Sequence, residues 1–252
     1  SSFNVTTQGI QIWTVPATGT YEIEVAGARG GEATQYTGSP NNATGGRGGK
    51  VSGRKTFTVG TKLAIIVGQA GGDAWGYHEA CGGGGASWVL SENLGTLHAV
   101  AGGGGGTNGA AYTVQGGGWG DGTATASDTY GGSSGSYNSG GGAGWTSDGS
   151  GGYAGNSYQM GGHKPANGAL GGDASQQHSG SSSYMQHGGF GGGGANGWHS
   201  GGGGGGYSGG DAVGYTTNPG ALGGTCRLEN MTSISYGGSH TGQHGYVKIT
   251  KI

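Results

Sequence analysis

The stretch Gly-Phe-Gly-Gly-Gly-Gly-Ala-Asn-Gly-Trp-His-Ser-Gly-Gly-Gly-Gly-Gly-Gly-Tyr-Ser-Gly-Gly, residues 189–210, decides the fold of this chain. Glycine fills fourteen of these 22 positions. An α-helix is disfavoured because each glycine costs a helix about 1 kcal/mol relative to alanine. An ordinary strand is disfavoured because glycine has no side chain to pack. We expect extended, left-handed helices of the polyproline-II type, which have no internal hydrogen bonds and must therefore bond to neighbouring segments.

Glycine remains abundant outward from this stretch, over a region from about Gly102 to Gly242. The chain has 252 residues, of which 72 are glycine and 4 are proline. Collagen is excluded because proline is scarce and glycine does not recur strictly at every third position. Ordering each residue costs about 1–2 kcal/mol, so a dense network of backbone hydrogen bonds must offset that cost where apolar residues are sparse.

Charge gives little indication of a partner. The chain has 10 basic and 12 acidic residues, for a net charge of −2. Neither nucleic acid nor an anionic membrane is therefore expected as a partner. No apolar run is long enough to insert into a membrane, and no signal peptide is present, so we expect Ser1 to be a mature N-terminus.

Cysteines and glycosylation sequons favour a secreted protein. Cys81 and Cys226 each adjoin a glycine run, and a disulfide between them is predicted, with two buried thiols as the alternative. Asn4, Asn42 and Asn230 each begin an Asn-x-Thr sequon, which predicts N-glycosylation outside the cell.

Period-two alternation of apolar residues predicts β-strands outside the glycine-rich region. Tyr21, Ile23 and Val25 are expected to face inward, whereas Glu22 and Glu24 face solvent. A pair of acid/base carboxylates is the functional alternative to this solvated strand face. Further strands are predicted at residues 8–15, 50–59, 62–67, 87–90, 96–101 and 245–250.

These strands define a β frame of residues 1–101 plus 245–252, with a glycine-rich insertion at 102–244, in one integrated domain. Six or seven short strands suit an all-β, two-sheet sandwich. The last strand can find a sheet only by returning to the first hundred residues. No helix is predicted anywhere in the chain.

Six blocks of sequence, in order along the chain, resemble the glycine-rich extracellular domain of the anaplastic lymphoma kinase and leukocyte tyrosine kinase receptors. They are residues 13–31, 82–89, 101–105, 188–194, 201–212 and 244–249. The resemblance implies a tumour-necrosis-factor-like β-sandwich that carries a large inserted bundle of polyglycine helices. It implies no signalling, because this sequence has no membrane span or kinase. The receptors have cysteine near the main glycine block where this chain has Asn-Gly-Trp-His at residues 196–199, so their disulfides and ligand site do not transfer.

Aromatic residues recur through the glycine-rich region and are the best candidates for ligand contacts. Trp119, Trp145 and Trp198 adjoin polar turn residues, and Tyr207 follows the longest glycine run. Rigid aromatic rings suit contact with sugars or protein surfaces. The alternative is that these rings cap the glycine slab and seal its edges.

No catalytic set stands out, and neither a metal nor a cofactor is predicted. Of the histidines, only His240 and His244 are loosely spaced like metal ligands, and no third ligand accompanies them. The Gly-Gly-x-Gly-x-Asp repeat of calcium-binding β-helices is not present.

The sequence favours a non-enzymatic, extracellular recognition or adhesion protein that binds a glycan or a protein. The first alternative is a self-assembling subunit of a filament, coat or matrix, whose partners are copies of itself. Ice binding is a second alternative, but no face shows a regular Ala/Thr ladder. A filament would bury its Trp and Tyr residues between copies, whereas a binding module would leave Trp exposed.

Overall fold

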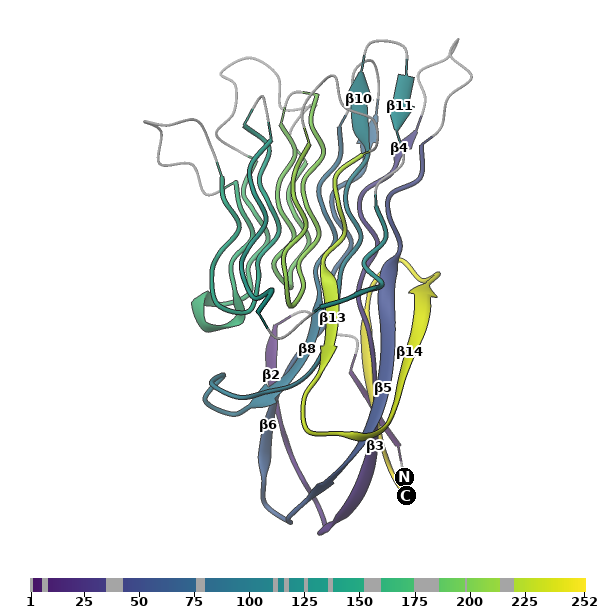
Figure 1. Cartoon of the computed structure of the whole chain (residues 1–252), viewed down its shortest axis with the longest axis vertical. Helices are drawn as coiled ribbons and strands as arrows, with labels where there is room; N and C mark the ends of the chain where they lie inside the picture. The colour runs from purple at the N-terminus through teal and green to yellow at the C-terminus, as the bar shows by residue number, and fades with distance from the viewer. Residues whose placement is uncertain are drawn as a thin grey trace.

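The protein is elongated in the computed structural model, with the longer β-strands and both termini at one end and the short strands β4 (Ala33–Thr34), β10 (Asn108–Ala110) and β11 (Thr113–Gln115) toward the other (Figure 1). Glycine-rich segments run side by side from the strands toward the opposite end (Figure 1). The structure describes residues 2–5, 9–34, 43–75, 80–110, 113–115, 118–124, 127–135, 138–151, 160–174, 186–197, 199–213 and 220–252. These residues contain no α-helix, in agreement with the sequence; a short 3-10 turn, η2, spans Pro165–Asn167.

Two main β-sheets form the strand region, which confirms the all-β prediction. Sheet A has the order β1 (Ser2–Val5), β15 (Tyr246–Lys251), β3 (Gly19–Ala26), β5 (Gly48–Phe57) and β14 (Thr232–His240). Sheet B has the order β12 (Gly122–Thr123), β13 (Thr225–Leu228), β9 (Leu97–Ala101), β8 (Ser87–Ser91), β6 (Lys62–Ile66) and β2 (Ile10–Thr14). Two small ladders join β4 (Ala33–Thr34) to β7 (Ala74–Trp75) and β10 (Asn108–Ala110) to β11 (Thr113–Gln115).

The closing strand returns to the start of the chain, as the alternation at 245–250 predicted. β15 lies between β1 and β3 and is antiparallel to both. Besides the short strands β10, β11 and β12, two longer strands, β13 and β14, come from residues that the sequence assigned to the insertion. β13 pairs with β9, and β14 pairs with β5. The chain therefore returns to the two main sheets before residue 245.

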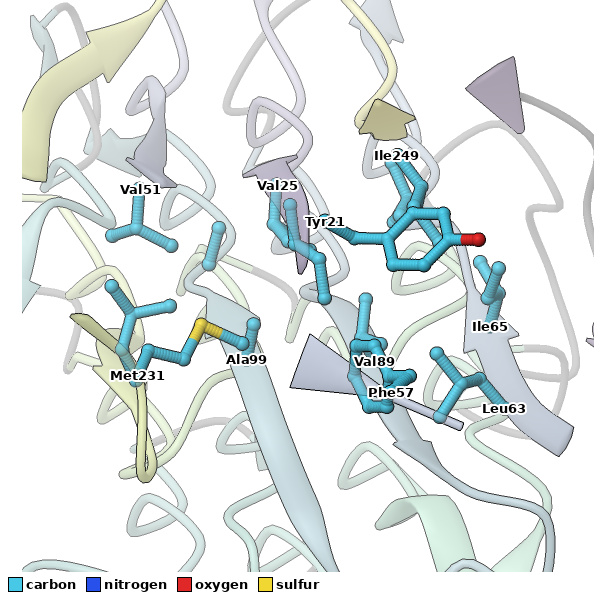
Figure 2. Close-up of a cluster of buried hydrophobic side chains, with 14 of the residues drawn as sticks. Tyr21, Val25, Val51, Phe57, Leu63, Ile65, Val89, Ala99, Met231 and Ile249 are labelled. Carbon is cyan, nitrogen blue, oxygen red and sulfur yellow. The ribbon is translucent and has the colours of Figure 1, made fainter. Parts of the chain in front are cut away.

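Alternation in β3 places its apolar side chains in the core. Tyr21, Ile23 and Val25 are at most 2% exposed, as predicted. Figure 2 shows the cluster that they join, with contributions from both sheets. The cluster contains Val51, Phe57, Leu63, Ile65, Val89, Ala99, Met231, Val247 and Ile249. Each large side chain buried in this way contributes about 1.5–3 kcal/mol.

The central strands β6, β8 and β9 of sheet B are buried on both faces, whereas the edge strands β2 and β12 are more exposed. One face joins the cluster in Figure 2, and the other carries Ala64, Ile66, Trp88 and Leu90, each 0% exposed. Phe190 and Tyr207, from the glycine-rich part of the chain, pack against this second face. The nearly continuous apolar sequence of β6 is therefore explained, because a strand covered on both sides needs no polar face.

The glycine array is the set of glycine-rich segments, mostly extended, that lie outside the two main sheets. It comprises residues 27–34, 43–47, 67–75, 80–86, 102–107, 118–121, 127–135, 138–151, 160–174, 186–197, 199–213 and 220–224. Segment 201–206 lies inside it and donates to three neighbouring segments in turn. Its donor–acceptor pairs are Gly202–Cys81, Gly203–Gly140, Gly204–Leu222, Gly205–Gly84 and Gly206–Ala143. Residues three apart thus reach the same neighbour.

Three other segments donate to the same central segment. Its carbonyl oxygens accept hydrogen bonds from the N–H groups of Gly103, Gly106, Gly194 and Gly210. The segment is therefore bonded to six neighbours, and most of its polar groups are satisfied by backbone alone. Such close approach excludes side chains: a Cβ on Gly204 would overlap the carbonyl oxygen of Gly103.

The predicted disulfide between Cys81 and Cys226 is wrong: both residues are thiols in the structure. The Cys226 thiol accepts a hydrogen bond from the Gly102 N–H (3.3 Å), whereas the Cys81 backbone lies beside Gly106. Four residues of extended chain separate these contacts by about 12 Å, and a disulfide requires Cα atoms within about 7 Å. Burial raises the pKa of Cys226 to about 12, which keeps the thiol protonated.

Candidate functional site

Five neighbouring segments of the glycine array, two of them extended by the first residues of β12 and β13, form one surface of the molecule. They are residues 43–47, 118–122, 220–225, 208–213 and 130–135. Within each segment, exposed or half-buried residues recur three positions apart: Thr44 and Arg47, Trp119 and Gly122, Leu222 and Thr225, Ser208 and Asp211, and Tyr130 and Ser133. Along segment 201–206, residues three apart donate hydrogen bonds to the same neighbouring segment. The exposed residues in each pair have the same spacing, which indicates that they point away from the array on one side.

Hydrogen bonds between neighbouring segments place one such residue from each segment at the same level. Gly120 N–H donates to Arg47 O, and Gly118 N–H donates to Ala221 O, each at 2.7 Å. Leu222 N–H donates to Asp211 O at 2.9 Å, and Ala212 N–H donates to Ser133 O at 3.0 Å. The result is a line across the five segments, the surface row, which consists of Arg47, Trp119, Leu222, Asp211 and Ser133.

The centre of the surface row is apolar. Trp119 is 55% exposed and Leu222 is 43% exposed. The Arg47 guanidinium carbon lies 5.4 Å from the centre of the Trp119 ring, a cation–π contact that holds the ring in place. The row therefore offers an aromatic and an aliphatic side chain on a backbone that is fixed by hydrogen bonds.

The surface row carries opposite charges on the two sides of its apolar centre. Arg47 lies beside Trp119, and Asp211 lies beside Leu222 on the other side. Asp211 Oδ1 accepts a hydrogen bond from the Ser133 N–H at 2.6 Å, which orients the carboxylate. Among the described residues, neither Arg47 nor Asp211 takes part in an ion pair. Both charges remain available to a partner.

The other aromatic candidates have different environments. Trp145 is half-buried and stacks on Trp88, with ring centres 6.1 Å apart. Tyr207 is only 6% exposed and lies under the guanidinium of Arg227, so its prediction as a ligand contact is wrong. Burial raises the pKa of Tyr207. Trp198 lies outside the described residues. Of the four candidates, Trp119 is therefore the one that the structure places on the surface row.

Sequence reasoning did not connect Arg47, Leu222 and Asp211 with Trp119. These residues are far apart in sequence, and each is a single residue among glycines. A helix with three residues per turn places every third residue on the same face, so this spacing could have indicated which positions of one segment are exposed together. The order of the five segments comes only from the fold.

The two glutamates on β3 are paired with cations of β5. Glu22 lies 3.3 Å from Arg54, and Glu24 lies 3.2 Å from Lys50. Burial pushes the pKa of Glu24 upward, but the hydrogen bond from Tyr246 and the nearby Lys50 outweigh it and hold the pKa below its usual value. This arrangement fits a solvated strand face with cross-strand ion pairs.

Histidine, cysteine, aspartate and glutamate do not gather in threes around a possible metal position in the part of the chain that the structure describes. Within the same part, no helix has the length and apolar character needed to cross a membrane. The histidine pair makes local contacts instead: His240 Nε2 donates to the His244 carbonyl oxygen at 3.0 Å.

The two sequon asparagines that the structure describes lie in different places. Asn230 is exposed, with φ of 53°, in the turn between β13 and β14. Asn4 is in β1, opposite Lys248 of β15. Asn42 lies outside the described residues. Asn230 is thus a surface position at which a glycan could be attached without entering the core.

No known family model matches this chain, and no curated protein matches it in sequence. The chemistry of the surface row is therefore the basis for a functional proposal.

Proposed function

We propose that this chain is a secreted, extracellular recognition or adhesion protein that binds glycan or protein surfaces through the surface row. The observation that carries the proposal is the exposure of Trp119, 55%, beside Leu222 on hydrogen-bonded backbone. Exposed tryptophan is costly in water and is enriched at the energetic centres of binding sites. A row held by backbone hydrogen bonds is already ordered, so binding loses little conformational entropy.

We propose further that the glycine segments are polyglycine helices carried by a tumour-necrosis-factor-like β-sandwich, as the resemblance to the receptor domains implies. The three-residue repeat of hydrogen-bond partners along segment 201–206 supports this, since such helices have three residues per turn. The core shared by sheets A and B supports the sandwich. The proposal also includes sugar on Asn4, Asn42 and Asn230, which suits a secreted protein.

Binding of the wild type and of Trp119→Ala to a glycan array and to a panel of extracellular proteins tests the function. We expect the variant to lose about 30-fold in affinity, or ~2 kcal/mol, for any ligand of the row. Tyr130→Ala is the matched control, because Tyr130 is 69% exposed but lies outside the row. Equal binding by wild type and Trp119→Ala to every ligand would refute the proposal.

A second candidate, a self-assembling structural subunit, is favoured by the edge of sheet A. Among the described strands, β14 pairs only with β5, and Ile234 and Tyr236 are 47% and 39% exposed along it. No charged residue or proline interrupts this strand, although its two register shifts oppose edge pairing. Light scattering and negative-stain imaging over a concentration series decide between the candidates. Open-ended polymers favour a subunit, and a monomer or closed oligomer favours recognition.

A further inference from the structure

The order of chemical groups along the surface row is self-complementary. From one end the row reads cation, aromatic ring, aliphatic side chain and carboxylate, in Arg47, Trp119, Leu222 and Asp211. Rotation by 180° about an axis between Trp119 and Leu222 reverses this order. A second row placed on the first in that way would set each of these four groups against its complement, while Ser133 lies beyond the matched set.

We infer that the partner recognised by the surface row is the same row on a second copy of this chain. This inference rests on the proposed function and names its partner. Arg47 lies against Asp211 of the second copy, and Trp119 packs on Leu222 of the second copy; the two-fold axis repeats both contacts. An isologous contact of this kind closes at two copies and does not propagate into a filament.

Charge is the first physical argument for this partner. Neither Arg47 nor Asp211 has an ion-pair partner among the described residues, and Asp211 is already oriented by the Ser133 N–H. The two-fold contact satisfies both charges in both copies. The parallel arrangement would instead place Arg47 on Arg47 and Asp211 on Asp211. Like-charge contacts of that kind exclude wrong registers, so the charges select the two-fold arrangement.

The residues around the row provide the second argument. One interval of three along four of these segments, the surface positions are small: Thr44, Gly122, Thr225 and Ser208. The fifth segment carries Tyr130, which is 69% exposed and lies beside Ser208, away from the apolar centre of the row. None of these four positions carries a large side chain that would hold the two surfaces apart. The apolar centre, Trp119 and Leu222, can therefore be excluded from water between two copies, with the charges at its rim.

Sedimentation of charge variants over a concentration series tests the contact. Wild type should dimerise, and Arg47→Asp or Asp211→Arg should each weaken dimerisation at least tenfold, because each variant places two like-charge pairs in the interface. Asp128→Arg is the matched control: it makes the same change of charge at an exposed position outside the row and should dimerise like wild type. Thermal melting of each variant checks that it is folded.

Mixing the Arg47→Asp and Asp211→Arg proteins tests the predicted contact most directly. One copy then has two carboxylates on the two sides of the apolar centre and the other has two guanidinium groups, so a mixed pair is fully complementary. We expect the Arg47→Asp and Asp211→Arg proteins to form a one-to-one heterodimer when mixed. A mixture that stays monomeric, or a wild type that is monomeric throughout the series, would overturn the inference.

The outcomes also separate this inference from the proposed function. If wild type remains monomeric but binds an array or panel ligand that Trp119→Ala does not bind, the surface row is a recognition site and its partner is not a second copy. If no ligand binds and the charge variants behave like wild type in sedimentation, both the function and the inference fail.

Discussion

The strand region and the glycine array are stabilised by opposite means. The strand region buries side chains: Ile23, Leu63 and Ile65 are 0% exposed between sheets A and B. The glycine array buries backbone, and its central segment is bonded to six neighbours through N–H and C=O groups. In the first region stability comes mainly from the hydrophobic effect, which is non-directional. In the second it comes from hydrogen bonds, which fix distance and direction.

This difference explains which substitutions each region tolerates. A hydrophobic core accepts changes of shape when volume and pattern are kept. The glycine array has no comparable freedom, because at most of its inward-facing glycines a neighbouring backbone occupies the space that a Cβ would need. The comparison therefore predicts that adding one carbon atom to the array is more damaging than removing many from the core.

Gly204→Ala is the direct way to break the glycine array. The new Cβ would overlap the Gly103 carbonyl oxygen, and no side-chain rotation relieves a clash with backbone. We expect a loss of more than about 4 kcal/mol in the free energy of unfolding, and in many preparations no folded protein. Gly122→Ala is the control, since its nearest neighbour would be a Thr225 methyl carbon at 3.6 Å. Denaturant unfolding measures both, and equal stabilities would contradict the close-approach argument.

Trp88→Ala tests the junction between the two regions. Trp88 is 0% exposed, stacks on Trp145, and donates from Nε1 to the Gly191 carbonyl oxygen at 3.4 Å. Its removal leaves a cavity, so we expect a loss of about 3–4 kcal/mol. The Gly191 carbonyl oxygen keeps its hydrogen bond from the Ala86 N–H, so the loss comes mainly from the cavity. Trp119→Ala removes the same side chain from the surface and should change stability by less than about 0.5 kcal/mol. Thermal melting compares the two variants.

Much of the strand region could be predicted because its signal lies in its own side chains. The alternation at residues 21–25 and the apolar run at 62–67 each indicate which face is buried, whatever strand lies alongside. The return of β15 to the first hundred residues also followed from the pattern, whereas its pairing with β1 and β3 comes from the structure. β14 was missed because Thr232–His240 is an edge strand that is largely exposed and has little alternation to detect.

The glycine array could be predicted only in part. Its extended, helix-free character followed from composition, but its neighbours could not, because one glycine run fits beside another in any order. Two predictions were wrong because the order of the segments was unknown: the ligand contact at Tyr207 and the disulfide between Cys81 and Cys226. Tyr207 is buried because its segment packs on sheet B, and Cys81 and Cys226 lie near opposite ends of segment 102–106. Trp119 was identified from its own residue type, whereas the row around it requires the order of the segments.

A change of pH should affect the stability of the strand region more than that of the glycine array. The strand region contains a buried titratable group, whereas backbone hydrogen bonds do not titrate. His98 is 8% exposed, and its Nδ1 accepts a hydrogen bond from Lys55 Nζ at 3.0 Å. Burial, with a smaller effect of the Lys55 charge, lowers the pKa of His98 from 6.5 to about 4. The unfolded chain therefore binds a proton that the folded chain resists, and stability falls as the pH drops from about 6.5 to about 4.

The expected loss over this interval is about 1 kcal/mol, because solvent near the ring reduces the full effect of the shift. His98→Gln keeps an acceptor for Lys55 but removes the titrating ring, so its unfolding midpoint should vary less with pH than that of the wild type. Lys55→Met separates the two causes: burial of His98 persists, and most of the pH dependence should remain. If Lys55→Met instead removes the dependence, charge rather than burial controls His98, and a hydrophobic core alone does not explain the acid sensitivity of the strand region.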